Sequence, residues 1–211
     1  FALDAALEEA FDEVQRLDLQ MSNYRPDSEW SKMNREAAHG PVAVSKETFE
    51  LLARCLEYSR ESEGTFDITV GPLMKIWGFY KGSGRIPHRA EIRTALGRVG
   101  WKKIRLDRAA GTVKFDAPVE IDPGGIGKGY AVDRMADILK SRGVTSGFIT
   151  AGRSSMYAIG APPNEPKGWR VEIPNPRDSR QVAWVYYLKD QSMATSGSTE
   201  KFFAAGNRIY T

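Results

Sequence analysis

The stretch Ile121-Asp-Pro-Gly-Gly-Ile-Gly-Lys-Gly-Tyr-Ala-Val-Asp133 places four glycines, Asp122 and Lys128 at the start of an amphipathic helical pattern. Glycine backbone approaches a ligand closely, and the helix that follows adds the positive end of its dipole. A lysine in the first helical turn opposes this dipole and is unfavourable unless an anion lies between them. The stretch therefore predicts a strand-to-helix loop that binds an anion, with phosphate as the usual candidate.

The spacing of this loop differs from two common phosphate-binding motifs. A Walker A motif needs Ser or Thr after its lysine, whereas Gly129 follows Lys128 here, and Asp122 occupies the place of the first glycine. A dinucleotide fingerprint needs a third glycine where this chain has Tyr130. Both motifs are excluded, and the plainer alternative is a tight turn whose glycines serve only backbone geometry.

Composition narrows the class of protein. The chain has 211 residues, of which 41% are hydrophobic and 27% charged, as expected for a folded globular protein. Its 30 basic and 27 acidic residues are interspersed, so no basic stripe indicates nucleic-acid binding. Cys55 is the one cysteine, and His39 and His88 are the two histidines, which excludes an internal disulfide and makes a histidine metal site a poor interpretation. The sequence contains no signal peptide or long apolar run.

The periodicity of apolar residues predicts the secondary structure. A helix with an apolar face is expected from Leu3 to Met21, and Asn23 to Ala38 is expected to be a polar loop with at most a short turn. Residues 66–79 are expected to be a buried irregular segment. Further helices are expected over residues 45–64, 90–99 and 127–142, a hairpin over 103–115, and strands over 148–150, 156–159, 169–173 and 182–188. The fold class predicted is α+β, with mixed or antiparallel sheets and flanking helices, in a single domain over residues 1–211.

Four separated segments carry a family resemblance. They are residues 21–34 (Met-Ser-Asn-Tyr-Arg-Pro-Asp-Ser-Glu-Trp-Ser-Lys-Met-Asn), residues 64–79 (Gly-Thr-Phe-Asp-Ile-Thr-Val-Gly-Pro-Leu-Met-Lys-Ile-Trp-Gly-Phe), the glycine loop, and residues 194–198 (Ala-Thr-Ser-Gly-Ser). In this order they resemble the ApbE family, the FAD:protein FMN transferases. The resemblance spans nearly the whole chain and implies an ApbE-like, T-fold-related architecture. The second segment and Gly-Lys-Gly-Tyr-Ala-Val-Asp are its most specific parts.

The resemblance implies a reaction and a set of site residues. Magnesium-bound FAD is cleaved at its pyrophosphate, the FMN half passes to a Thr or Ser hydroxyl of a target flavoprotein, and AMP is released. Such phosphoryl transfer depends on neutralised phosphate charge and a positioned hydroxyl. By similarity, Gly125 offers its carbonyl to Mg²⁺. The residues expected to contact FAD are Tyr24, Thr65, Phe66, Asp67, Asp122 and Lys128.

Several residues of the four segments also have a plainer interpretation. Asp67 is suited to capping a turn, and Asp122 before a proline is suited to an ordinary turn. Tyr24 is equally suited to a half-buried position in a loop. Thr195 and Ser196 have the composition of a strand end.

Two departures from the family pattern affect the prediction. Where the family commonly has Ala-Gly-Gly-Asp, this chain has Ala-Gly-Arg-Ser-Ser over residues 151–155. The family's His-x-x-Asp-Pro segment and its later Asp and Thr metal ligands would lie beyond Thr211, so the catalytic residues stay unknown. Because Phe1 falls within a helical pattern and Thr211 within a motif, we expect trimming at both ends, with an apolar cleft or an unpaired strand edge left exposed.

Three functions are compatible with this sequence. The leading one is Mg²⁺-dependent FMN transfer to a target flavoprotein. The alternatives are a flavin-nucleotide-binding protein without transferase activity and an FAD pyrophosphatase that releases FMN and AMP. The resemblance also implies a periplasmic or extracytoplasmic location, with membrane contact only through a removed lipid anchor.

Overall fold

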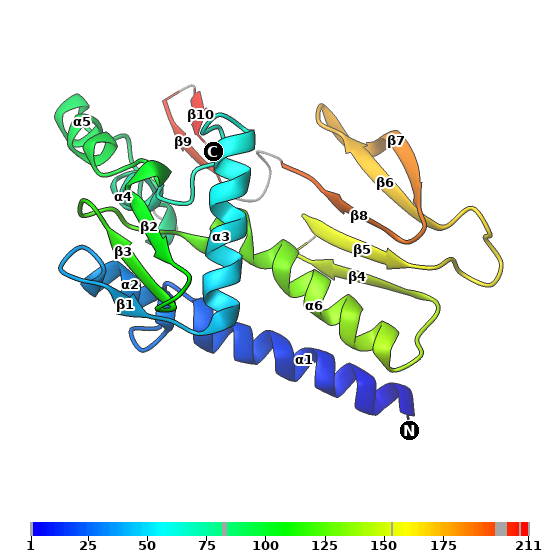
Figure 1. The fold of residues 1–211 in the computed structure, drawn as a ribbon. Coiled ribbons are helices and arrows are strands. Elements are labelled where there is room, and N and C mark those ends of the chain that lie inside the picture. Colours follow the sequence, from blue (N-terminus) through cyan, green and yellow to red (C-terminus); the bar gives the residue numbers. More distant parts are fainter. Residues whose placement is uncertain (1, 82–83, 153, 197–201, 207, 211) are drawn as a thin grey trace. The chain divides into compact units, whose positions relative to one another are not determined.

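The structure, a computed structural model, describes residues 2–81, 84–152, 154–196, 202–206 and 208–210 (Figure 1). The chain forms two compact units. Unit 1 comprises residues 1–17 and 127–196, and unit 2 comprises residues 18–126 and 197–211. The chain therefore passes between units three times: within the first helix, within the glycine loop, and after Ser196. The single domain predicted over residues 1–211 stays a prediction.

Unit 1 is built from two helices and two antiparallel sheets. The residues of α1 (Ala2–Met21) up to Leu17 lie next to α6 (Gly127–Ser141), and α6 runs along strands β4 (Gly147–Ala151) and β5 (Ser155–Ile159) (Figure 1). Strand β8 (Gln191–Ala194) completes a sheet of order β4-β5-β8. This arrangement places the first turn of α6 and the β4–β5 turn in the same unit.

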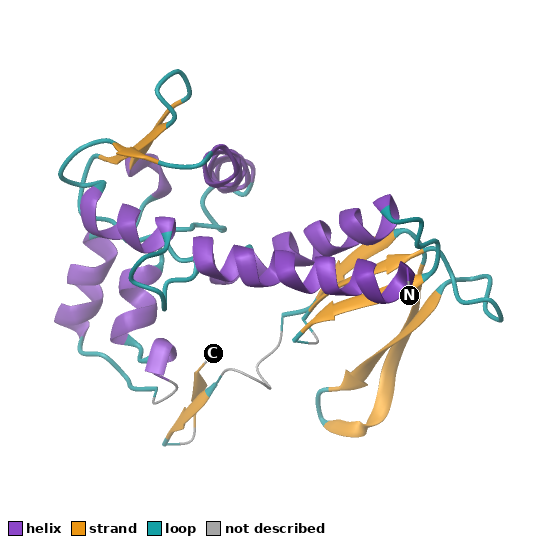
Figure 2. Ribbon diagram, turned by 90° about the horizontal axis from the view of Figure 1, so that it is seen from below, coloured by secondary structure: helices purple, strands orange, loops and turns teal. Residues whose placement is uncertain are grey.

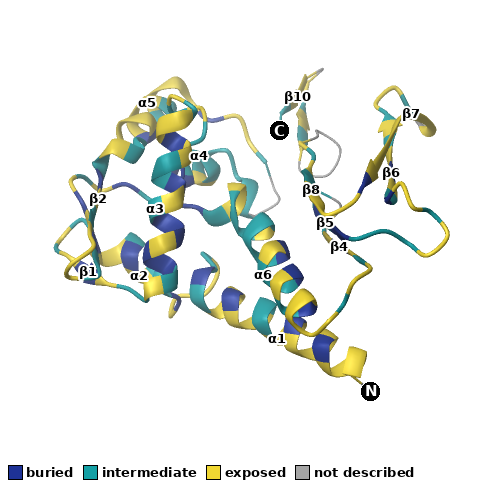
Figure 3. Ribbon diagram, turned by 45° about the vertical axis from the view of Figure 1, so that its right-hand side comes forward, coloured by how far each residue is buried: buried dark blue, intermediate teal, exposed yellow. Residues whose placement is uncertain are grey.

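The core of unit 1 shows why α1 and α6 lie close together. Ala6 and Ala10 are buried against Val132, Ala136 and Leu139 of α6, and their small side chains allow the helices to approach closely. The apolar face expected for α1 is only partly buried, since Leu3, Leu7 and Phe11 are 55%, 38% and 58% exposed. Figure 3 shows exposed residues along α1. The helix prediction is confirmed, but small residues rather than these large ones make its contact with α6.

A long hairpin forms the second sheet of unit 1. Strands β6 (Trp169–Asn175) and β7 (Asp178–Leu188) pair antiparallel, with a register irregularity on either side of Pro174. Proline lacks the N–H that a regular ladder needs, which accounts for an irregularity at this position. Val171 and Leu188 pack with Met156 and Ala158 of β5. Both strands were predicted from their alternating patterns, and β7 is longer than predicted.

Unit 2 combines helices with two small antiparallel sheets. Strands β1 (Val42–Ala43), β3 (Thr112–Phe115) and β2 (Ile104–Asp107) pair in that order, and β9 (Phe203–Ala205) pairs with β10 (Arg208–Tyr210). The helices, in chain order, are α2 (Glu29–Glu36), α3 (Lys46–Glu61), α4 (Gly71–Ile76), η1 (Phe79–Lys81), α5 (Arg89–Gly97), η2 (Trp101–Lys103) and η3 (Pro123–Gly125). The predicted hairpin over residues 103–115 corresponds to β2 and β3.

Two segments of unit 2 are more regular than predicted. The loop expected from Asn23 to Ala38 contains α2, because Ser28 caps the helix by accepting from the N–H of Ser31, and Trp30 and Met33 are fully buried. The irregular segment over residues 66–79 contains α4, whose second residue is Pro72. Proline suits the first turn of a helix, so it marks a helix start here rather than a break.

Both units mix helices with antiparallel strands, which confirms the predicted α+β class (Figure 2). Each unit also has its own buried apolar residues. Among the helices that the structure describes, none is both long enough and apolar enough to cross a membrane.

Candidate functional site

The side chain of Asn34 joins the first motif segment to the glycine loop. Its Oδ1 accepts from the N–H of Ile121 at 2.7 Å, and its Nδ2 donates to the carbonyl of Ile121 at 3.0 Å. Asn23 donates to the same carbonyl at 3.2 Å. Two residues of the segment 21–34 therefore fix the backbone immediately before Asp122.

The second motif segment lies beside the same stretch. The N–H of Asp122 donates to the carbonyl of Ile68 at 2.7 Å, and Val70 forms a parallel bridge with Glu120. A methyl group added at Gly125 would lie 3.2 Å from the ring of Phe66. Glycine at this position therefore lets the Phe66 ring approach the loop backbone.

Asp122 is buried and held at both carboxylate oxygens. Oδ1 accepts from the N–H of Gly124 at 2.6 Å, and Oδ2 accepts from the hydroxyl of Tyr80. Only 7% of Asp122 is exposed. Burial, with the hydrogen bond to Asp122, raises the pKa of the Tyr80 hydroxyl well above its usual range, so Tyr80 keeps its proton. Asp122 caps η3, as its plainer interpretation suggests, and it sits next to exposed glycine backbone.

Both carboxylate oxygens of Asp67 accept hydrogen bonds within unit 2. Its Oδ1 accepts from both the N–H and the hydroxyl of Thr69, at 2.8 and 2.6 Å. Its Oδ2 accepts from the N–H of Trp101 at 3.0 Å. These contacts match the turn-capping interpretation, and they fix the segment that carries exposed Thr65 and half-buried Phe66.

Tyr24 is open to solvent beside this cluster. It is 72% exposed, and its ring meets the ring of Tyr80 edge-on, with centroids 5.9 Å apart. An exposed aromatic side chain that is supported on one edge leaves its other surface available to a ligand. Tyr24, Thr65, Phe66, Asp67 and Asp122 are all in unit 2.

Lys128 lies in unit 1. Its ammonium donates to the hydroxyl of Ser154 in the β4–β5 turn, and the carbonyl of Ser154 accepts from the N–H of Thr195 at 2.8 Å. Gly152 in the same turn has φ of +58°, in the left-handed region that favours glycine. The turn that departs from the family pattern therefore contacts Lys128. Arg153, Gly197 and Ser198 lie outside the described residues.

The glycine loop uses part of its hydrogen-bonding capacity internally. The N–H of Gly124 donates to Asp122, and the N–H of Ile126 donates to the carbonyl of Pro123 at 3.0 Å. The loop was predicted to direct its N–H groups toward an anion, and two of them are engaged within the loop. Lys128 is exposed, so its ammonium is accessible to an anion from solvent.

The described residues do not form a magnesium site by themselves. Mg²⁺ requires octahedral oxygen coordination, and within the described ranges no three His, Cys, Asp or Glu side chains come together to hold a metal ion. Gly125 is exposed, and its carbonyl is one ligand group at most. Within unit 2, the exposed ring of Tyr24 and the exposed backbone of Gly124 and Gly125 suit a nucleotide better than a metal ion.

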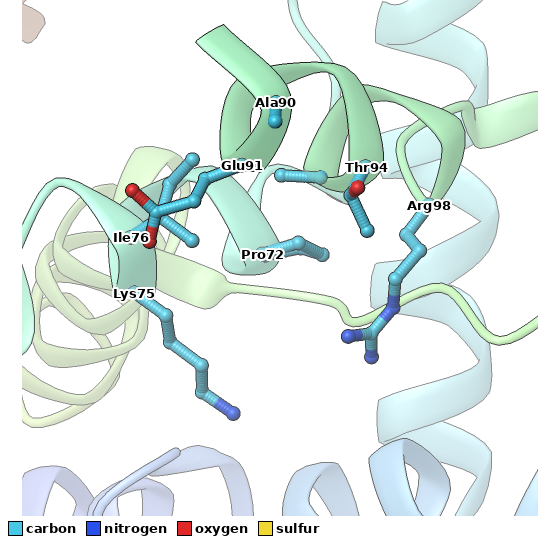
Figure 4. Close-up of a pocket in the computed structure, with 8 residues that line it drawn as sticks. Pro72, Lys75, Ile76, Ala90, Glu91, Thr94 and Arg98 are labelled. Carbon is cyan, nitrogen blue, oxygen red and sulfur yellow. The ribbon is translucent and has the colours of Figure 1, made fainter. Parts of the chain in front are cut away.

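An open hollow lies elsewhere in unit 2, between α4 and α5. Figure 4 shows side chains of both helices around it. Lys75 and Arg98 at its rim form ion pairs with Glu120. The residues that line it are Pro72, Lys75, Ile76, Ala90, Glu91, Thr94, Ala95 and Arg98. It contains none of the residues that the sequence predicts to contact FAD.

A comparison with family profiles identifies the same family as the four segments. The ApbE family profile matches residues 2–211. The chain belongs to the ApbE family. Three of the family segments meet at residues 120–122 in unit 2, and the fourth adjoins the turn that contacts Lys128 in unit 1.

Relatives and solved structures support the family assignment. FAD:protein FMN transferases of Treponema pallidum and Vibrio cholerae are 29% and 31% identical to the chain, over 94% and 95% of its length. The chain spans only 59% and 58% of these curated relatives. The crystal structure of a Thermotoga maritima ApbE protein matches 98% of the chain at TM-score 0.90 and 32% identity, and the match covers 67% of that protein. The apo flavinyl transferase ApbE of Pseudomonas stutzeri matches 99% at TM-score 0.85 and 29% identity, over 64% of its own chain. These matches confirm the ApbE-like fold.

Sequence reasoning missed the residues that join the segments. Asn23 and Asn34 lie within a segment recognised as a family motif, but nothing in their spacing indicated contact with Ile121. Tyr80 follows the second segment directly and was not singled out. The only sequence signal for these residues was their place in or beside a motif.

Proposed function

We propose that the protein transfers FMN from FAD to a Thr or Ser hydroxyl of a target flavoprotein and releases AMP. The observation that carries this proposal is the meeting of three family segments at residues 120–122, where Asp122 and exposed glycine backbone lie next to Phe66. Membership of the ApbE family and relatives named FAD:protein FMN transferase support the same chemistry.

In this proposal the residues of the two units have different roles. Tyr24, Thr65, Phe66, Asp67 and Asp122 contact the flavin nucleotide in unit 2. Lys128 in unit 1 neutralises phosphate charge, which is the main requirement of a phosphoryl transfer. Ser154 orients the Lys128 ammonium through their hydrogen bond.

The reaction balances without a covalent intermediate on the protein. The acceptor hydroxyl oxygen forms a bond to the phosphorus on the FMN side of the pyrophosphate. The bond from that phosphorus to the oxygen bridging to AMP breaks, and AMP leaves with the electron pair. The hydroxyl proton is released. Lys128 stabilises the negative charge that accumulates on the phosphate oxygens during this exchange.

Magnesium dependence is part of the proposal. The carbonyl of Gly125 is the ligand expected from this chain, and phosphate oxygens of FAD add oxygen ligands of the kind that Mg²⁺ prefers. The partner is a flavoprotein with an acceptor Thr or Ser, and nucleic acid is not expected to bind. The location proposed is periplasmic or extracytoplasmic, with a lipid anchor as the only route to a membrane.

Mass spectrometry tests the proposed transfer. The protein is incubated with FAD, Mg²⁺ and a Thr-containing candidate flavoprotein, and the acceptor peptide is then examined for the added mass of an FMN moiety. We expect the modified peptide and an equal amount of AMP. An acceptor with its Thr replaced by Val is the matched control, because it keeps the side-chain shape and removes the hydroxyl.

The same experiment separates the alternatives. Release of FMN and AMP in equal amounts, without modification of the acceptor, identifies an FAD pyrophosphatase. FAD binding without AMP release identifies a binding protein. Either result contradicts the proposed transfer.

A further inference from the structure

Tyr80 contacts two of the predicted FAD-binding residues of unit 2. Its hydroxyl donates to Oδ2 of Asp122, and its ring meets the ring of Tyr24 at an interplanar angle of 89°. Asn23 donates to the Tyr80 hydroxyl at 3.4 Å. One half-buried side chain in η1 therefore connects the first motif segment to the glycine loop.

The surroundings of Tyr80 make its hydroxyl a donor to Asp122. A phenol has one hydrogen to donate and accepts through its oxygen. Because the Asn23 amide donates to that oxygen, the phenolic hydrogen is left for the Asp122 carboxylate. Burial keeps the hydroxyl protonated at physiological pH.

The Tyr80 contact limits the freedom of Asp122. The carboxylate is bound at Oδ2 by Tyr80 and at Oδ1 by the N–H of Gly124, at 2.6 Å, so its plane has a fixed orientation. Each carboxylate oxygen has a second lone-pair site, which can accept from a ligand hydroxyl or amide. By fixing Asp122, Tyr80 also fixes the backbone conformation at Gly124.

We propose that Tyr80 is a positioning residue that sets the orientation of both Asp122 and Tyr24 for FAD, an inference that rests on the proposed function. Its hydroxyl acts on Asp122, and its ring acts on Tyr24. The two effects are separable, because Tyr80→Phe removes only the hydroxyl and Tyr80→Leu removes the ring as well.

Two measurements test this role. Amide hydrogen exchange without FAD reports the Asp122–Gly124 contact directly, and we expect the Gly124 amide to exchange about tenfold faster in Tyr80→Phe. Calorimetry reports FAD affinity. In metal sites, loss of a residue that orients a metal-binding side chain lowers metal affinity about 10- to 100-fold. By analogy, we expect FAD affinity to fall about tenfold in Tyr80→Phe. Tyr80→Leu should lower it further, through Tyr24.

A double-mutant cycle distinguishes positioning from general stability. If Tyr80 acts through Asp122, Tyr80→Phe should have no further effect on FAD affinity once Asp122→Asn is present. Tyr157→Phe is the matched control, because it removes a hydroxyl that contacts Lys140 on α6, and it should leave both measurements unchanged. Urea unfolding checks that each variant is folded, and Tyr80→Phe decides the question if Tyr80→Leu does not fold.

Defined outcomes overturn the inference. Unchanged Gly124 exchange in Tyr80→Phe shows that Tyr80 does not fix Asp122. An equal loss of FAD affinity in the wild-type and Asp122→Asn backgrounds shows that Tyr80 does not act through Asp122. If the wild-type protein binds no FAD, the proposed function fails, and Gly124 exchange still decides whether Tyr80 positions Asp122.

Discussion

Asn34 pairs with the backbone of Ile121 as a strand would, accepting from its N–H at 2.7 Å and donating to its carbonyl at 3.0 Å. Ile121 is fully buried, so both of its backbone groups need partners within the protein. A side-chain amide is one of the few groups that can satisfy a donor and an acceptor together. Asn34 thereby fixes the residue before Asp122.

Asn34→Ala is expected to destabilise the protein and weaken FAD binding. It leaves the N–H of Ile121 without its hydrogen-bond acceptor, which costs about 1–3 kcal/mol of unfolding free energy. Urea unfolding and calorimetry with FAD measure the two effects. The matched control is Asn175→Ala, in which an exposed turn loses one hydrogen bond to Arg177. Equal stability of the two variants would contradict this role of Asn34.

Lys128→Ala is expected to weaken FAD binding while leaving stability nearly unchanged, because the side chain is exposed. Charge-assisted contacts with phosphate are worth about 1.5–3 kcal/mol, and the loss should shrink at high salt. Calorimetry at two salt concentrations measures the loss of FAD affinity and its dependence on salt. Lys140→Ala, a basic residue in the last turn of the same helix, should have little effect on affinity. Unchanged FAD affinity in Lys128→Ala would show that Lys128 does not contact the phosphates of FAD and only contacts Ser154.

Asp67→Ala is expected to lower the unfolding free energy by about 2 kcal/mol, because three donors lose their acceptor. Asp67→Asn keeps one acceptor oxygen and should recover part of that stability. Calorimetry with FAD separates capping from direct contact. If Asp67→Asn recovers both stability and affinity, capping accounts for Asp67, and if it recovers stability alone, the carboxylate charge contacts the nucleotide or its metal.

Glu13 is expected to make the stability of unit 1 depend on pH. Its carboxylate accepts from Arg16 and from Arg134 of α6, and the hydrogen bond to Arg16 is the main reason that its pKa falls to about 2. A lowered pKa in the folded state stabilises the protein above the unfolded value of 4.5, and this stability is lost as pH falls toward 2.

Glu13→Gln should therefore lower the free energy of unfolding by about 1–2 kcal/mol at pH 7. This difference from the wild-type protein should shrink steadily below pH 4.5. Urea unfolding at several pH values measures it. Glu8→Gln, an exposed acid on the same helix, is the control and should change stability little at any pH. A Glu13→Gln effect that does not change with pH would show that packing, rather than charge, accounts for its cost.

The sequence by itself determined the features that depend on near neighbours. Helix α6 follows from the glycine loop and the apolar periodicity after it, and the hairpin of β2 and β3 follows from alternation on either side of a turn. The prediction that the loop binds an anion rests on glycines and a lysine within a few residues, and it stays a prediction. The sequence predicted a loop where the structure has α2, because the short apolar face of this helix contains little beyond Trp30 and Met33.

The tertiary structure decided which distant residues act together. Asn34 and Ile121 are 87 positions apart, and Tyr80 and Asp122 are 42 apart, so no local pattern indicates either pair. It also decided that Ala6 and Ala10, rather than Leu3 and Phe11, are buried on α1. Hydrogen bonds and close packing depend on positions in space, and residues far apart in the chain acquire those positions only when the chain folds.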